Sequence, residues 1–207
     1  MRLEVNNIKQ WLIKTNEKIQ KNKQYLTKLD QAVGDGDHGI NMARGFEAVV
    51  QRITNKRYEH VSDILKDTAM TVMSKVGGAA GPLYGTAFLR LSLSFKGKET
   101  IDYSDLVKGL EDAVKGIKQR GRSTEGEKTL VDVWDPVVNQ MLNQDDVNPE
   151  QMTETAKMAI EKTKEMVATK GRAAYFKEKS IGHIDPGAMS SYYVISALAD
   201  VLKGGHP

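Results

Sequence analysis

Apolar residues recur every three or four positions along almost the whole chain, which is the spacing of an amphipathic α-helix. About eight helices are predicted, with apolar stripes at 5–26, 43–53, 64–76, 84–91, 106–117, 130–141, 152–167 and 188–202. The stretch 170–184 is expected to be a longer loop, and residues 204–207 a frayed tail. No convincing strand, linker or repeat interrupts this pattern. The chain is therefore predicted to be all-α, with one domain over residues 1–207.

Capping residues and prolines indicate where several helices begin. The segments 148–150 (Asn-Pro-Glu) and 185–187 (Asp-Pro-Gly) each place a capping side chain directly before a proline at the first helical position. Asp102 or Ser104 is the expected cap of the helix that follows them. Pro136 falls inside the next apolar stripe, where it is expected to kink that helix or delay its start.

The bulk composition narrows the class of protein. Hydrophobic residues make up 40% of the 207 positions and charged residues 28%, which is ordinary for a soluble globular protein. No apolar run approaches the roughly 20 residues of a membrane span, and the N-terminus lacks the apolar core of a signal peptide. The chain has no cysteine, so a cytoplasmic location is expected. Because the net charge is only +3 and the charges are scattered, neither nucleic acid nor a membrane is an expected partner.

The segment 29–41 (LDQAVGDGDHGIN) concentrates the most chemistry. On a helix, Asp30, Asp35 and Asp37 would point in different directions, but the intervening glycines favour a loop that brings the carboxylates together. Three carboxylates about 4 Å apart would repel one another by roughly 4 kcal/mol per pair, so the cluster needs cations. Oxygen ligands of this kind suit Mg²⁺ or Ca²⁺.

Three other interpretations of this segment are weaker. The run 34–39 matches the dinucleotide-binding pattern G-x-G-x-x-G, but that fingerprint requires a preceding strand, and a helix is predicted there. An EF-hand that starts at Asp35 would need glycine and glutamate where Ile40 and Phe46 stand. A simple capping role for Asp37 explains one aspartate but not all three. A metal site is therefore favoured.

Two more turns carry groups that suit phosphates. The segment 77–82 (GGAAGP) leads into a helix with exposed backbone N–H groups, and the segment 185–187 opens the last helix. Arg172 and His183 lie in the loop between helices. Each feature alone has an ordinary explanation as a tight turn, a cap or a surface charge. Together with the aspartate segment, they indicate a Mg²⁺–nucleotide site at one end of a helical barrel.

Four stretches carry a resemblance to a known family. They are LDQAVGDGDHGINMARGF, SKVGGAAGPLYGTAF, GEKTLVDVWDPV and GRAAYFKEKSIGHIDPGAMSS, and they span nearly the whole chain. In these stretches the sequence resembles the nucleotide-binding L subunit of dihydroxyacetone kinase. The resemblance implies a barrel of eight antiparallel helices with the nucleotide bound at its rim, which agrees with the predicted helix count.

The resemblance also implies roles for individual residues. Asp30, Asp35 and Asp37 correspond to ligands of two Mg²⁺ ions that bridge to the nucleotide phosphates. The residues that correspond to nucleotide contacts are His38, Gly39, Ile40, Asn41, Gly78, Ala79, Ala80, Gly121, Leu130, Arg172, Asp185, Pro186 and Gly187. No nucleophilic residue is implied, and His38 is expected to contact phosphate rather than to carry it.

Two positions depart from the family pattern. Ala80 stands where the family usually has serine, which removes a hydroxyl contact but leaves the backbone donors in place. Leu130 stands where methionine is common, and this apolar replacement is expected to pack against adenine equally.

A reaction follows from the same resemblance. In free-standing subunits of this type, ADP stays bound as a prosthetic group and is phosphorylated in place by a phosphohistidine of the M subunit of the phosphoenolpyruvate phosphotransferase system. The resulting ATP donates its γ-phosphate to dihydroxyacetone held on the K subunit. Two alternatives stay open, namely an ATP-exchanging kinase subunit of the same fold and a helical adaptor whose aspartate segment binds Ca²⁺.

Overall fold

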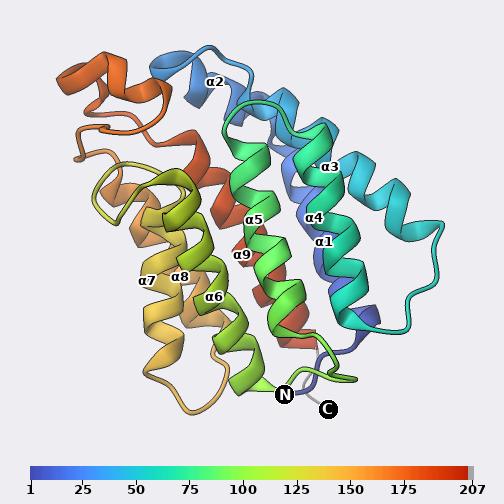
Figure 1. The fold of residues 1–207 in the computed structure, drawn as a ribbon. Coiled ribbons are helices and arrows are strands. Elements are labelled where there is room, and N and C mark those ends of the chain that lie inside the picture. The colour runs from blue at the N-terminus through green and yellow to red at the C-terminus, as the bar shows by residue number, and fades with distance from the viewer. Residues whose placement is uncertain (205–207) are drawn as a thin grey trace.

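The computed structural model describes residues 1–204, which are helical almost throughout (Figure 1). Within this range lie nine α-helices and one 3₁₀ helix: α1 Val5–Lys21, α2 Lys23–Val33, α3 His38–Thr54, α4 Val61–Lys75, α5 Ala80–Ser94, α6 Tyr103–Gly121, α7 Val131–Leu142, α8 Pro149–Lys162, η1 Arg172–Ser180 and α9 Pro186–Gly204. The all-α prediction is confirmed, since the described residues contain no strand beyond an isolated β-bridge between Leu3 and Ile101. Of the expected frayed tail, Gly204 ends α9, and residues 205–207 lie outside the described part.

The prediction of one long helix over 5–26 is wrong, because α1 and α2 meet at Asn22. This residue leaves the helical region, with φ −110° and ψ 15°, and its side-chain amide donates to the Lys18 carbonyl at 2.8 Å. That bond gives a partner to a carbonyl at the end of α1. The apolar stripe carries no sign of the break, since Ile19 and Leu26 are both buried on either side of it.

Several predicted helix starts are confirmed by their capping bonds. The side-chain oxygens of Asp102, Asn148 and Asp185 each accept a hydrogen bond from the backbone N–H three residues later, at 2.8, 3.0 and 2.7 Å. Pro136 does not delay α7, which begins upstream of it at Val131 and continues through the proline. Because proline has no N–H, Pro136 contributes no backbone donor to this helix.

The sequence predicts a longer loop over residues 170–184. This prediction is wrong in part, because the stretch contains the 3₁₀ helix η1. The segment is kinked at Lys177, whose φ of 50° lies in the left-handed region. Ser180 stabilises the kink, since its hydroxyl donates to the Lys177 carbonyl at 2.6 Å and accepts from the Ala168 N–H at 2.9 Å. Ala173 packs with Val33 at the end of α2. These contacts hold η1 over the segment that follows α2.

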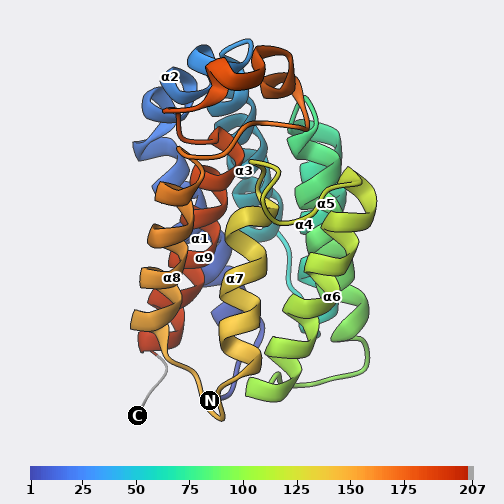
Figure 2. The same ribbon diagram turned by 90° about the vertical axis from the view of Figure 1, so that its left-hand side faces the viewer.

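The helices pack in an order that closes on itself (Figures 1 and 2). From α3 to α9 each α-helix contacts the next along the chain, α9 contacts α1, and α1 contacts α3. An aromatic cluster fills part of the interior, where Phe88 lies 5.6 Å from Trp11 and 6.2 Å from Phe46 between ring centroids. None of the helices in residues 1–204 is both long enough and apolar enough to cross a membrane.

One end of this helical assembly is special because four helices begin there. The helices α3, α5, α7 and α9 all run from the end that carries α2 and η1 toward the end where the N-terminus lies (Figure 1). Helix N-termini carry unpaired N–H groups and the positive end of the helix dipole. The fold therefore gathers four partial positive charges at one rim.

Candidate functional site

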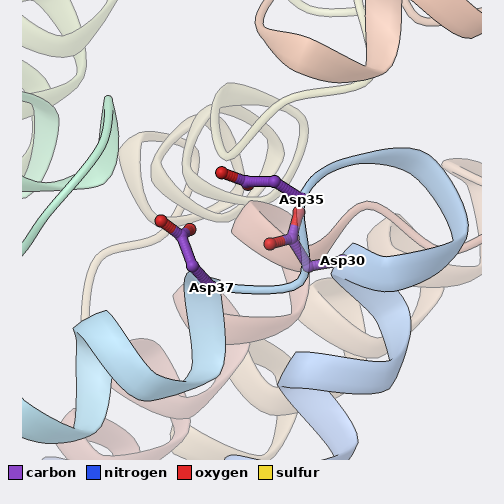
Figure 3. A group of neighbouring side chains, drawn as sticks. All are labelled: Asp30, Asp35 and Asp37. Atoms are coloured by element: carbon purple, nitrogen blue, oxygen red, sulfur yellow. The ribbon is translucent and has the colours of Figure 1, made fainter.

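Asp30, Asp35 and Asp37 converge at this rim, as the sequence predicts (Figure 3). One carboxylate oxygen from each lies within 4.8 Å of the other two. Asp30 is buried near the end of α2, and its Oδ2 accepts a hydrogen bond from the His38 N–H at 3.0 Å. Gly34 permits this arrangement, because a β-carbon there would collide with Oδ1 of Asp30. The glycines of the segment thus allow the carboxylates to meet.

The carboxylate cluster has the donor set of a hard divalent cation. Its ligand atoms are all oxygens, which suit Mg²⁺ or Ca²⁺ and disfavour softer metals. Asp37 precedes α3, but its side chain makes no capping hydrogen bond, so the carboxylate is left to face the rim. Neighbouring like charges at this distance need a compensating positive charge. The residues present therefore fit a metal site.

A pocket of about 500 Å³ adjoins the carboxylates. Of the sixteen predicted metal and nucleotide contacts, thirteen line this pocket: Asp30, Asp35, Asp37, His38, Gly78, Ala79, Ala80, Gly121, Leu130, Arg172, Asp185, Pro186 and Gly187. These residues are far apart in the sequence. Most of them meet because they lie at or just before the starts of α3, α5, α7 and α9, which share this rim, whereas Asp30, Gly121 and Arg172 come from α2, α6 and η1.

The turn 77–82 forms another part of the pocket wall. Gly78 has a φ of 66°, a left-handed conformation that favours glycine. Ala79 occupies the capping position of α5 but has no side chain that could cap it, so the first N–H groups of the helix keep no capping partner. Such a helix start is suited to phosphate.

Three predicted nucleotide contacts do not line the pocket. Gly39 faces α2, where a β-carbon would collide with the Lys23 carbonyl, so this glycine allows α3 to pack closely. Ile40 is exposed on the outside of α3. Asn41 is buried, and its Oδ1 accepts from the Arg44 guanidinium at 2.8 Å. None of the three therefore presents a side chain to the pocket surface.

The side chains of His38 and Arg172 are both engaged within the protein. Nε2 of His38 lies 2.9 Å from the Ser190 hydroxyl, and burial lowers the pKa of the imidazole despite the nearby carboxylates. Arg172 pairs with Asp35, with 2.5 Å between Nη1 and Oδ2. The ring of His38 thus points into the protein, whereas Arg172 spans the pocket mouth.

A buried lysine forms the floor of the pocket. Nζ of Lys128 donates to the carbonyls of Thr163, His183 and Met166, at 2.5, 2.6 and 3.3 Å. An ammonium group has three hydrogens, so these bonds use its whole donor capacity. Burial lowers its pKa and raises that of the neighbouring Asp185 to about 7. Lys128 therefore joins three loops beneath the pocket.

Sequence reasoning missed several residues of the site. Tyr84, Lys128 and Ser190 were not singled out, although Tyr84 and Lys128 line the pocket and Ser190 contacts His38. Tyr84 and Ser190 lie on buried faces of helices, so the sequence pattern indicates only that these positions belong to the core. A lysine in a polar segment gives no local signal of burial. His183 is exposed, and its backbone carbonyl, rather than its ring, contacts the floor.

The fold and the site together define a class of protein. It is an all-helical protein whose rim pocket combines three clustered carboxylates with several helix N-termini, an arrangement that would suit a metal ion together with a phosphate. Residues 32–200 match the DAK2 domain family. The chain belongs to this family, as the resemblance predicted.

Relatives cover nearly the whole chain. It is 50% identical over 188 residues to the "PEP-dependent dihydroxyacetone kinase 1, ADP-binding subunit DhaL" of Listeria innocua, which covers 91% of this chain and 92% of the relative. It is 46% identical to the "PTS-dependent dihydroxyacetone kinase, ADP-binding subunit DhaL" of Lactococcus lactis, over 97% of this chain and 99% of that one. The corresponding Escherichia coli subunit is 38% identical, over 98% and 100%.

A solved structure has the same fold. It is the dihydroxyacetone kinase from C. freundii in complex with AMP-PNP and Mg²⁺, with a TM-score of 0.76 and 20% sequence identity. The match covers 92% of this chain and 33% of that one. The helical arrangement of this chain therefore also occurs as part of a longer kinase chain.

Proposed function

We propose that this chain is the ADP-binding subunit of a phosphoenolpyruvate-dependent dihydroxyacetone kinase and so acts in phosphoryl transfer. The observation that carries the proposal is the convergence of three carboxylates with the starts of four helices in one pocket. Carboxylates attract cations and helix N-termini attract phosphates, and a Mg²⁺–nucleoside diphosphate presents both groups. The names of relatives that are 38–50% identical support the assignment.

Asp30, Asp35 and Asp37 would hold the metal, and we propose two Mg²⁺ ions there. Bound Mg²⁺ would neutralise phosphate charge and orient the phosphate oxygens for in-line transfer. The protein's own contribution is to hold the three carboxylates together, with Asp30 kept in place by the His38 N–H. No side chain is assigned a nucleophilic role, because phosphoryl transfer depends mainly on position and charge.

The pocket walls supply the remaining nucleotide contacts in this proposal. Backbone N–H groups of the Gly78–Ala80 turn and the N–H of Gly187 at the α9 start would bind phosphate oxygens, since Pro186 has no N–H and the Ala188 N–H is capped by Asp185. Leu130 is buried beside Gly187 and offers an apolar surface for the base. The contacts proposed for the nucleotide as a whole are His38, Gly39, Ile40, Asn41, Gly78, Ala79, Ala80, Gly121, Leu130, Arg172, Asp185, Pro186 and Gly187. Gly39, Ile40 and Asn41 would act through the backbone of α3.

The proposed reaction needs two partner proteins in the cytoplasm. A phosphohistidine of an M subunit would phosphorylate the bound ADP, and the γ-phosphate would then pass to dihydroxyacetone on a K subunit. The phosphoenolpyruvate dependence in the names of the relatives supports this relay. An ATP-exchanging kinase subunit of the same fold is the competing possibility, and the exchange rate of the nucleotide separates the two.

The first experiment identifies the nucleotide in the purified protein. The protein is desalted and denatured, and the supernatant is analysed by chromatography. Stoichiometric ADP is expected, and the absence of adenine nucleotide would count against the proposal. Slow exchange with labelled ATP, and dependence of activity on the phosphohistidine donor, are expected of the relay. Rapid exchange and activity without that donor would instead indicate an ATP-dependent kinase subunit.

The second experiment tests the metal assignment. Asp35→Asn is expected to release the nucleotide and to lower the melting temperature of the Mg²⁺–ADP complex, because one cation ligand loses its charge. Asp200→Asn is the matched control, since Asp200 pairs with Lys18 on the surface, away from the pocket. Full nucleotide retention and activity in Asp35→Asn would contradict the assignment. A larger melting shift with Ca²⁺ than with Mg²⁺, and no nucleotide, would favour the adaptor alternative.

A further inference from the structure

A chain of buried hydrogen bonds runs beneath the pocket and joins four helices. The Tyr84 hydroxyl oxygen lies 2.7 Å from Oγ of Ser190 and 2.8 Å from Oγ of Ser191. Ser190 also lies 2.9 Å from Nε2 of His38, and Ser191 accepts from the Trp134 indole N–H at 3.0 Å. Tyr84, Ser190 and Ser191 are completely buried. The chain thus connects α3, α5, α7 and α9 through side chains alone.

The members of this chain lie directly below the segments that form the pocket. Tyr84 follows Ala80 by one helical turn, and Ser190 follows Pro186 by one turn. His38 is the first residue of α3, directly after the aspartate segment. The bonds of this chain therefore join the first two turns of helices whose starts form the pocket wall.

The hydroxyl of Tyr84 has no spare bonding capacity. A phenol offers one hydrogen and accepts through its oxygen, and here the oxygen lies near two serine hydroxyls and 3.2 Å from the Gly187 carbonyl. The carbonyl can only accept. If the oxygen were removed, Ser190 and Ser191 would lose a partner in a site that water does not reach. The phenolic oxygen is thus the central atom of the chain.

We propose that Tyr84 and Ser190 are positioning residues for the nucleotide, whose hydroxyls keep the aspartate segment, the 77–82 turn and the start of α9 at a fixed separation. The inference rests on the proposed function, because it takes these three segments to hold one Mg²⁺–nucleotide together. Neither hydroxyl is assigned a contact with the reacting atoms. A ligand that bridges separate segments loses affinity when their separation is relaxed, even if the fold persists.

The test compares three variants of the full chain, each stripped of nucleotide. Tyr84→Phe and Ser190→Ala are each expected to weaken binding of ADP with Mg²⁺ by about tenfold in titration calorimetry. The double variant is expected to lose little more ADP affinity than either single variant, because both substitutions interrupt the same chain of hydrogen bonds. If Tyr84→Phe folds poorly, Ser190→Ala alone tests the expected loss of ADP affinity.

Trp11→Phe is the matched control. It removes a buried N–H that donates to the Val194 carbonyl of α9 at 2.9 Å, and it removes more volume than Tyr84→Phe does. Trp11 belongs to no part of the chain beneath the pocket. This variant is therefore expected to lower the melting temperature at least as much while its ADP affinity stays at the wild-type value. Wild-type affinity in Tyr84→Phe, or an equal loss in Trp11→Phe, would overturn the positioning role.

Hydrogen exchange in the ligand-free protein separates this inference from the proposed function. Amides in 35–41 and 77–82 are expected to exchange about tenfold faster in Tyr84→Phe than in the wild type, and at the wild-type rate in Trp11→Phe. Wild-type protein that fails to bind Mg²⁺–ADP would overturn the proposed function, whereas faster exchange would still support the positioning role. Unchanged exchange in Tyr84→Phe would overturn the positioning role whatever the ligand.

Discussion

Nη1 of Arg172 lies 2.5 Å from Oδ2 of Asp35, so η1 is tied to the aspartate segment across the mouth of the pocket. The two residues are 137 positions apart in the sequence. Arg172 offsets one negative charge of a cluster that otherwise carries three. The guanidinium therefore supplies part of the positive charge that a bound cation would otherwise provide.

This ion pair predicts opposite effects of Arg172→Ala on metal and nucleotide. The affinity of the nucleotide-free protein for Mn²⁺ is expected to rise about threefold, because Asp35 loses a competing cation. The affinity for ADP with Mg²⁺ is expected to fall, since a positive charge at the mouth is lost. The free energy of unfolding should change by less than about 1 kcal/mol, because Arg172 is mostly exposed. Metal titration of Arg172→Ala beside Arg172→Lys checks this, and an unchanged Mn²⁺ affinity in the alanine variant would contradict it.

Asp185 predicts a pH dependence of stability in the ligand-free protein. Burial raises its pKa from 3.8 to about 7, so the folded protein binds a proton there that the unfolded chain releases. The associated stabilisation is fully present below pH 3.8 and is lost as the pH rises through 7. Asp185→Asn keeps an acceptor for the Ala188 N–H and removes the titration.

The stability difference between wild type and Asp185→Asn isolates this group. It is expected to shift by up to about 4 kcal/mol in favour of the variant between pH 4 and 8. Denaturant unfolding of both proteins across this range measures the shift. A difference that stays constant with pH would show that Asp185 keeps its ordinary pKa.

Lys128 is predicted to be among the most sensitive positions for stability. Lys128→Met would leave the carbonyls of Thr163, Met166 and His183 without their buried donor. The expected loss is about 3 kcal/mol of the free energy of unfolding. Lys96→Met is the control, because Lys96 is exposed and its replacement should change stability by less than about 0.5 kcal/mol. Similar unfolding midpoints for the two variants would refute the role of Lys128.

Thr15 offers a stabilising substitution away from the pocket. Its Oγ1 is buried and has no hydrogen-bond partner within the described residues. Thr15→Val keeps the shape and removes the unpaired hydroxyl, so stability is expected to rise by about 1 kcal/mol. Thr68→Val is the matched control, since the buried Thr68 hydroxyl donates to the Ile64 carbonyl at 2.8 Å and its loss should bring no gain. Equal thermal shifts for the two variants would argue against this explanation.

Local features of the chain were well predicted from the sequence. Helix periodicity and caps act over three or four residues, so the sequence predicts the starts at Asn148 and Asp185 and narrows a third to Asp102 or Ser104, of which Asp102 is the cap. The break at Asn22 and the 3₁₀ helix after Gly171 could not. Both depend on contacts that leave the apolar pattern unchanged. Periodicity alone therefore predicts helices better than their interruptions.

The sequence by itself determined the all-α class, the family and the segments that supply the pocket, because these follow from helical periodicity and from short motifs. Only the tertiary structure decided which way the side chains point. In the structure, the His38 ring contacts Ser190 in the interior, and Arg172 pairs with Asp35. Lys128 lies under the pocket. The physical reason is that each of these side chains finds its partner in a distant segment, which no local pattern specifies.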